Sequence, residues 1–365
     1  MQKASQECHS EALTPKNPEM LRCAQKDRIS LSEAAAFLLQ NDNYLILTHR
    51  RPDGDTIGSA AALCRGLRAI GKTAWICENP QFTPKFAPFL ETLIASVDAC
   101  RDKPRLSASA GLGEADERGS SLRLAPTILS VDVASRSLFP FGMEQAEVAL
   151  AIDHHGSNDG FAARTHVEAD KAACGEIIWA LLGLLDVQPD KQIAEAIYVA
   201  VSTDTGCFRY ANVTANTLRV AADCLACGAE SYPITRVMFE TKRWPRLQLE
   251  RYLVEHMAFF HGGLVAVSAI PNAVLDELGL TEDDIDDISG FGLLVEGVEI
   301  AVMLREVEGG DGKISVRTGP GYDASAICRR LGGGGHKGAA GATVAGGIQQ
   351  AKAEILTAIE EEMKE

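Results

Sequence analysis

The chain has 365 residues, of which 46% are hydrophobic, and it carries a formal net charge of −15 at pH 7. This length favours two domains over a single core. The acidic balance argues against a protein that wraps long nucleic acid, because such binding depends on many phosphate neutralisations by Lys and Arg. The acidic balance remains compatible with a small phosphorylated ligand held in one locally basic pocket.

Membrane and secretory segments are not expected. No apolar run reaches the roughly 18–20 residues of a membrane span, and the first twenty residues contain no apolar core of a signal peptide. The ten cysteines are scattered, and several lie in apolar stretches where a thiol acts as a small hydrophobe. We therefore expect a cytoplasmic protein with no membrane partner.

The first half of the chain alternates predicted strands and helices. Residues 43–49 (NYLILTH) predict a strand that ends at His49, and the helix that follows is expected to have Asp55 or Thr56 as its cap. The unpatterned stretch 101–124 predicts a surface loop. Further strands are expected over 73–78, 127–132 and 148–153, and helices over about 30–40, 174–186, 190–203 and 214–228.

The second half predicts a smaller unit. A long helical stretch is followed by strands over 262–270, 298–307 and 313–319, a helix, a flexible glycine loop over 332–341 (GGGGHKGAAG) and a closing helix. The fold class is therefore α/β: a parallel-sheet domain with helices on both faces, a smaller α/β domain, and a cleft between them. The expected divisions are a mobile extension at 1–28, a first domain at 29–235, a helical connector at 236–260 and a second domain at 261–365.

Acids and histidines gather where the predicted strands end. In parallel sheets ligand sites lie beyond the carboxyl ends of the strands. A single Asp there is usually a cap or turn former, but several together would repel one another unless cations lie among them. The residues concerned are His49, Asp53, Asp55, Asp132, Asp153, His154 and His155, with Asp204 in the turn after a helix.

This mixture of ligands indicates a transition metal. Imidazole with carboxylate suits Mn²⁺, and also Fe²⁺, Co²⁺ or Zn²⁺, better than Ca²⁺. Two such ions side by side can clamp phosphoryl oxygens. The sequence therefore predicts a pair of divalent ions, with Mn²⁺ preferred, and phosphoester hydrolysis.

Five segments resemble a known family. THRRPDGDTIGS, LSVDVAS, AIDHHGSN and VSTDTGCFRY are similar, in order, to the four motifs of the DHH phosphoesterases. SVRTGPGYDASAICRRLGGGGHKGAAG resembles their DHH-associated C-terminal domain, and the resemblance covers about 40–345. Within the family the chain is most similar to the nanoRNase/pAp phosphatase (bifunctional oligoribonuclease) group, which includes enzymes acting on linear dinucleotides and cyclic di-AMP.

The resemblance implies a role for each matched position. His49 and Asp53 match ligands of one metal, and Asp132 matches a bridging carboxylate. Asp153 matches a residue that orients a histidine. His155 matches the residue that faces the substrate phosphate. The second metal would be held by Asp55, His154 and Asp204, and substrate would be bound by Arg317, Gly333, Gly334, Gly335 and His336.

The expected substrate is a short oligonucleotide or a mononucleotide bisphosphate. Two other readings stay open: an inorganic pyrophosphatase or exopolyphosphatase with the same metal motifs, and a non-catalytic nucleotide sensor on the same fold. A homodimer is also left open. Arg50 and Arg51 add unusual charge to the first motif, where they either attract phosphate or point outward.

Overall fold

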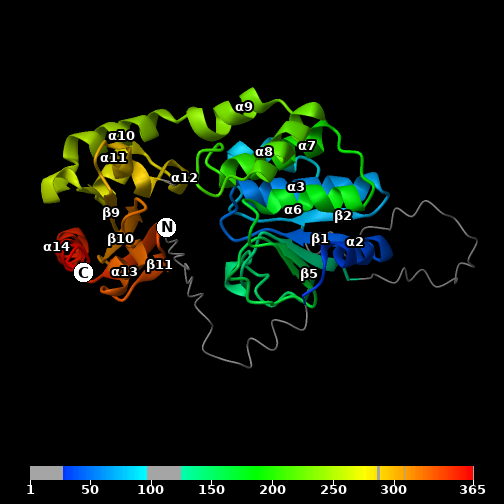
Figure 1. Cartoon of the computed structure of the whole chain (residues 1–365), viewed down its shortest axis with the longest axis horizontal. Helices are drawn as coiled ribbons and strands as arrows, with labels where there is room; N and C mark the ends of the chain where they lie inside the picture. The colour runs from blue at the N-terminus through cyan, green and yellow to red at the C-terminus, as the bar shows by residue number, and fades with distance from the viewer. Residues whose placement is uncertain (1–27, 97–124, 286–287, 308, 365) are drawn as a thin grey trace, which may run out of the picture. The chain divides into compact units, whose positions relative to one another are not determined.

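The computed structural model describes residues 28–96, 125–285, 288–307 and 309–364. The expected extension before residue 28 and the expected loop over 101–124 lie outside these ranges. The chain divides into two compact units, unit 1 up to Thr241 and unit 2 from Lys242 (Figure 1). This division falls inside the stretch 236–260 that we expected to be a helical connector.

Unit 1 contains a six-stranded sheet in which every pair of neighbours is parallel. The spatial order is β3-β2-β1-β4-β5-β6. The order changes direction between β1 and β4, and ligand sites in open parallel sheets form at such a switch point. The strands are β1 (Tyr44–Leu47), β2 (Ala74–Cys77), β3 (Ile94–Ala95), β4 (Thr127–Val131), β5 (Val148–Asp153) and β6 (Thr165–Val167).

Helices of unit 1 pack together on one face of this sheet (Figure 1). Alternate strand residues such as Ile46 and Val131 enter this core, while Leu45 and Leu47 enter a second core on the other face. The helical elements are α2 (Leu31–Gln40), α3 (Gly54–Ala69), η1 (Pro84–Phe86), α4 (Ala87–Leu90), α6 (Cys174–Leu184), α7 (Lys191–Asp204), α8 (Ala215–Ala226), α9 (Ser231–Thr235) and the π-helical turn η3 (Arg236–Glu240).

A second core lies on the other face of the sheet. Among the described residues it is closed by irregular segments around Val133, Phe139 and Ala162, with only the 3-10 turn η2 (Arg136–Leu138) nearby. The rings of Phe139 and Phe161 meet edge to face, with centroids 5.0 Å apart. These aromatic side chains cover part of this face of the sheet.

Helices α3 and α7 approach each other closely because glycines line their contact. A Cβ atom on Gly58 would lie 2.2 Å from the carbonyl oxygen of Ala196, and one on Gly54 would lie 2.3 Å from Oγ1 of Thr203. Neither approach is possible with a larger residue. This packing brings Asp55, near the start of α3, towards Asp204, at the end of α7.

Unit 2 contains a mixed six-stranded sheet in the order β11-β12-β10-β9-β8-β7. Only β8 and β9 are parallel; the other neighbours are antiparallel. Ile314 and Val316 of β10 pack with α13 and α14 on one face, and Met303 of β9 packs with α10 on the other. The strands are β7 (Ala258–Phe260), β8 (Val265–Ile270), β9 (Ile300–Glu306), β10 (Gly312–Thr318), β11 (Gly334–His336) and β12 (Ala339–Val344). The helical elements are α10 (Trp244–His256), η4 (His261–Gly263), α11 (Asn272–Leu278), α12 (Glu282–Ile285), η5 (Ile288–Leu294), α13 (Ala324–Arg329) and α14 (Gly347–Glu362).

Two local predictions in unit 2 were wrong. Residues 334–336 and 339–341, expected in a flexible glycine loop, lie in the antiparallel pair β11–β12, in which β12 continues to Val344. Residues 258–260, expected in the helical connector, form β7. β7 and β11 are only three residues long, and their strand conformation depends on pairing with β8 and β12, which local propensity does not report. In the described part of the chain no helix is long and apolar enough to cross a membrane.

Candidate metal centre

His49 and Asp53 lie in the loop between β1 and α3. Nε2 of His49 is 3.4 Å from Oδ1 of Asp53. Asp53 is also the N-cap of α3, because its Oδ1 accepts hydrogen bonds from the backbone N–H groups of Asp55 at 3.0 Å and Thr56 at 3.1 Å. The prediction of a cap at Asp55 or Thr56 was therefore wrong. The cap holds the carboxylate of Asp53 in place beside His49.

Asp132 follows β4 directly and is almost fully buried. Its φ of +58° lies in the left-handed region, which an Asp tolerates but seldom adopts. Its Oδ2 is 3.9 Å from Nε2 of His49, and its Oδ1 is 3.4 Å from Nε2 of His154. Within the described residues, Oδ1 is buried without a hydrogen-bond partner. A buried carboxylate oxygen of this kind is costly unless a cation or donor satisfies it.

His154 faces a group of carboxylates with its Nε2 atom. That atom is 3.7 Å from Oδ2 of Asp55, 3.4 Å from Oδ1 of Asp132 and 3.5 Å from Oδ2 of Asp204. On the other side of the ring, Nδ1 lies 3.2 Å from the carbonyl oxygen of Lys171. A carbonyl only accepts, so Nδ1 carries a proton, and Nε2 is the atom that can bind a metal ion in place of its own proton. This is the arrangement of a metal-ligating histidine.

Asp55 is held from behind by donors. Its Oδ2 accepts a hydrogen bond from the N–H of Cys174 at 2.6 Å, and its Oδ1 accepts from the N–H of Gly175 at 2.9 Å. Both donors belong to the first turn of α6, where free N–H groups favour a negative charge. Oγ of Ser59 donates to Oδ1 at 3.0 Å. These bonds keep the buried Asp55 oriented towards His154.

Proximity of the acids changes their ionisation. Burial, helped by the nearby charge of Asp204, raises the pKa of Asp55 to about 7. Burial and the Asp55 charge raise the pKa of Asp132 well above its ordinary value, and burial raises that of Asp204. Burial acts to lower the pKa of His154, but the surrounding carboxylates raise it to about 10. Such mutual destabilisation is what a bound cation relieves.

The donor set fits divalent metal ions. One group of ligand atoms within 4.8 Å of one another comes from His49, Asp53 and Asp132, and a second comes from Asp55, His154 and Asp204. Asp132 lies between the two groups, with one oxygen towards each histidine. The structure thus brings together all six residues expected to hold metal.

A third grouping adds His155 to Asp132 and His154. Nδ1 of His155 lies 2.8 Å from Oδ1 of Asp153 but 3.6 Å from Oδ1 of Asp132. Because the closer contact engages this nitrogen, the geometry favours His154 over His155 as a ligand.

Asp153 is completely buried at the end of β5. Its Oδ1 accepts from the backbone N–H groups of His154 at 2.8 Å and His155 at 3.1 Å, and Asn158 donates to Oδ2 at 2.7 Å. Burial acts to raise the pKa of Asp153, but the bonds from His155 and Asn158 keep it below its ordinary value. The residue orients His155 and does not face the cluster. Our sequence analysis missed Asn158, although it stands inside the AIDHHGSN motif.

Arg50 is occupied elsewhere. Its Nε donates to the carbonyl oxygen of Phe139 at 3.2 Å, its Nη2 is 3.5 Å from Glu144, and its guanidinium lies 4.3 Å from the ring centroid of Phe141. It therefore anchors the segment after β4. Arg51 is exposed.

In unit 2, Arg317 and His336 lie in one row of the sheet. Arg317 on β10 and His336 on β11 are both paired with Ala339 on β12, from opposite sides. Directly paired residues of antiparallel strands project to the same face. Only a small side chain therefore stands between the two expected substrate-binding groups.

Packing also explains glycines in and just before β11. A Cβ on Gly333 would lie 2.2 Å from the carbonyl oxygen of Gly341, and one on Gly335, where φ is +151°, would lie 2.5 Å from that of Ala339. Gly334 has open space around its Cβ position. Close strand pairing thus accounts for two of the three glycines without a ligand.

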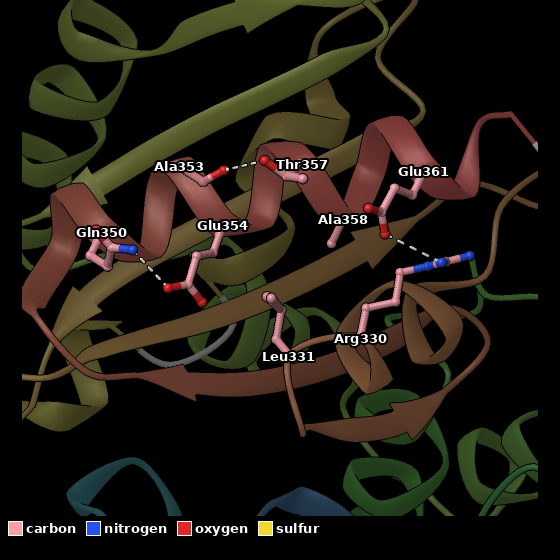
Figure 2. A pocket seen from close by; sticks show the side chains of 8 residues that line it. All are labelled: Arg330, Leu331, Gln350, Ala353, Glu354, Thr357, Ala358 and Glu361. Carbon is pink, nitrogen blue, oxygen red and sulfur yellow. Dashed lines mark hydrogen bonds and ion pairs between the residues drawn. The ribbon is translucent and has the colours of Figure 1, made fainter.

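A separate groove of about 400 Å³ lies between α14 and the end of α13 (Figure 2). Its polar side chains bond to one another: Gln350 donates to Glu354 at 2.8 Å, and Arg330 donates to Glu361 at 3.4 Å. None of the expected site residues lines it. It is not a candidate for the active site.

A parallel sheet with these acids and histidines at its switch point defines an α/β protein with a divalent-metal centre. Comparison with family models agrees: the DHH family N-terminal domain matches residues 43–201, and the DHHA1 domain matches 263–365. The chain belongs to the DHH family and is a metal-dependent phosphoesterase.

Individual relatives support this assignment. The bifunctional oligoribonuclease and PAP phosphatase NrnA of Thermus thermophilus is 35% identical over 321 residues, 87% of this chain and 89% of the relative. The cyclic-di-AMP phosphodiesterase PdeA of Listeria monocytogenes is 22% identical, and the match covers 88% of this chain and 47% of the length of that relative. A crystal structure of an exopolyphosphatase-related protein from Bacteroides fragilis shares the fold, with a TM-score of 0.75 at 21% identity, covering 91% of this chain and 95% of that chain.

Proposed function

We propose that this enzyme hydrolyses phosphate esters of short nucleotides, namely RNA fragments of a few residues and adenosine 3′,5′-bisphosphate (pAp). The observation that carries the proposal is the pair of ligand groups linked by Asp132, which belongs to the first group and lies 3.4 Å from His154 of the second. The substrate class comes from the Thermus thermophilus relative, which this chain matches over nearly its whole length.

In this proposal two divalent ions, Mn²⁺ by preference, occupy the cluster. His49 and Asp53 would hold one ion, Asp55, His154 and Asp204 would hold the other, and Asp132 would contribute to both. Imidazole and carboxylate ligands together favour Mn²⁺ over Ca²⁺. When bound, the ions supply positive charge that activates water and stabilises the phosphoryl oxygens.

His155 would act on the substrate through Nε2. Asp153 accepts the Nδ1–H of His155 and, being buried and ionised, fixes the ring and its tautomer. Nε2 then remains to hydrogen-bond a phosphoryl oxygen of the substrate. Asp153 is accordingly a positioning residue.

Unit 2 would bind the remainder of the nucleotide. The guanidinium of Arg317 matches the fork geometry of a phosphate, and His336 is exposed on the same face of the sheet. Gly334, with open space at its Cβ position, lets a ligand approach the backbone of β11.

Linear and cyclic dinucleotides are a second candidate class, since the Listeria monocytogenes relative is a cyclic-di-AMP phosphodiesterase. We further infer cytoplasmic action, because the seven described cysteines form no disulfide, as expected in a reducing compartment. The homodimer remains a proposal, to be tested by sedimentation velocity.

One substrate panel tests the function. The purified enzyme with Mn²⁺ is assayed on pAp, pApA, cyclic di-AMP, a five-residue RNA and pyrophosphate, with Asp132→Ala as the inactive control. We expect cleavage of the short RNA and pAp. Turnover of pyrophosphate alone would support the pyrophosphatase instead, and nucleotide binding without turnover would support a sensor.

A further inference from the structure

Residues 168–175 connect β6 to the first turn of α6, and we call them the β6–α6 segment. The carbonyl oxygen of Lys171 in this segment lies 3.2 Å from Nδ1 of His154. The last two residues of the segment donate their backbone N–H groups to the carboxylate of Asp55, at 2.6 and 2.9 Å. The segment therefore orients two of the three ligands expected at the second metal position, His154 and Asp55.

Asn212 connects the same segment to the third of these ligands, Asp204. Its Nδ2 donates to the carbonyl oxygen of Ala172, within the segment, at 3.2 Å and to the carbonyl oxygen of Asp204 at 3.1 Å. Asp204 is the last residue of α7, where carbonyl groups lack a partner within the helix. One side-chain amide thus fixes the end of α7 against the β6–α6 segment.

The backbone directly after Asp204 is strained. Gly206, Cys207 and Phe208 have φ values of +54°, +59° and +61°, all in the left-handed region. Glycine adopts this conformation readily, whereas a bulky residue such as Phe seldom does. A strained turn persists only while the surrounding contacts enforce it. We therefore expect Asp204 to lose its position when Asn212 no longer holds it.

Glu168 holds the start of the segment. Its Oε1 lies 2.9 Å from Nε2 of His166, and its Oε2 lies 3.2 Å from Nζ of Lys171. The backbone N–H of Lys171 donates to the carbonyl oxygen of Glu168 at 3.2 Å. These contacts close a turn that places the carbonyl group of Lys171 beside His154.

The first metal position is supported by other parts of unit 1. The carboxylate of Asp53 accepts from backbone N–H groups in the first turn of α3. The carbonyl oxygen of His49 accepts from Nδ2 of Asn79 at 3.0 Å, and Asn79 is a buried residue that follows β2. These supports are far in sequence from the β6–α6 segment. We therefore expect a change in that segment to disturb only the second metal position.

We propose that Asn212 is a positioning residue that sets the metal affinity of the second position alone, and that Glu168 does the same from the other end of the β6–α6 segment. This inference rests on the proposed function, since it takes two metal positions as given. It means that the two ions are bound with separately adjustable affinities.

A double-mutant cycle tests the inference through metal binding alone. Binding is followed by the loss of the electron paramagnetic resonance signal of free Mn²⁺, for Asn212→Ala in the wild type, in His49→Ala and in His154→Ala. His154→Ala retains the first position, and His49→Ala retains the second. We expect Asn212→Ala to weaken one of the two ions of the wild type about 10-fold. It should weaken the remaining ion of His49→Ala equally and leave that of His154→Ala unchanged.

Glu168→Ala should weaken the same single ion. Asn272→Ala, which changes an exposed asparagine at the start of α11 in unit 2, is the matched control and should bind both ions as the wild type does. A merely structural role of Asn212 would weaken both ions. Equal weakening of both, weakening of neither, or a wild type that binds a single ion would each overturn the inference. Failure of the proposed function would be seen differently, as wild-type enzyme that binds two Mn²⁺ ions but cleaves neither pAp nor short RNA.

Discussion

Oδ1 of Asp132 lies 3.4 Å from Nε2 of His154, while its Oδ2 faces His49 at 3.9 Å. One buried carboxylate therefore links two histidines that follow different strands, β1 and β5. Because Oδ1 has no hydrogen-bond partner in the described structure, the residue is better suited to binding a cation than to stabilising the fold.

Replacing Asp132 with Asn should separate these two roles. We expect turnover with Mn²⁺ to fall at least about 10³-fold, because both proposed metal positions lose a ligand. In EDTA the variant should be about 1 kcal/mol more stable than the wild type, since a buried, unsatisfied charge is removed. Urea unfolding measures the stability. Asp170→Asn, at a position with 81% side-chain exposure, is the control and should change neither quantity.

Asp153→Asn should impair turnover while metal binding persists. The amide oxygen can still accept from the backbone, but it no longer stabilises the Nδ1–H of His155 as a carboxylate does. We expect kcat to fall about 10²-fold or more, with little change in the Mn²⁺ affinity measured by calorimetry. A variant that loses Mn²⁺ binding would show that Asp153 belongs to the metal site itself.

Metal binding should depend on pH in a defined direction. Without metal, the pKa of Asp55 is about 7 and that of His154 about 10, so at pH 6 both hold protons that a cation must displace. The rise in Tm caused by Mn²⁺ should therefore be larger at pH 8 than at pH 6. Differential scanning calorimetry at fixed free Mn²⁺ measures it. An equal rise at both pH values would contradict these pKa shifts.

Gly58→Ala should damage both stability and the metal site. Its methyl group would meet the carbonyl oxygen of Ala196 at 2.2 Å and push α7, which carries Asp204, away from α3. We expect a loss of about 2 kcal/mol or more in unfolding free energy and weaker Mn²⁺ binding. Gly183→Ala in α6 is the matched control, because nothing lies within 4 Å of its Cβ position. It should be neutral or slightly stabilising.

The order of residue types along the chain was enough to predict most strands of unit 1 and the ligands of the metal centre. The apolar runs at 44–47, 127–131 and 148–153 are strands in the structure, and an acid or histidine follows each closely or closes it. Parallel strands direct their carboxyl ends to one edge, so the residues after them must gather there whatever the strand order. This is why five of the six candidate ligands could be named from the strand pattern, whereas Asp204, at the end of α7, depended on the motif resemblance.

Tertiary structure decided how these residues are used. Asp53 and Asp55 are two positions apart, yet one caps α3 and the other is buried against the start of α6, a choice that depends on where α6 packs. The strand order, the left-handed backbone at Asp132 and the pairing of β10 with β12 likewise depend on contacts between segments far apart in the sequence. Local sequence determines which side chains are available for the metal centre. Long-range packing determines which of their atoms meet, because the packing energy that fixes their positions exists only when the whole chain is folded.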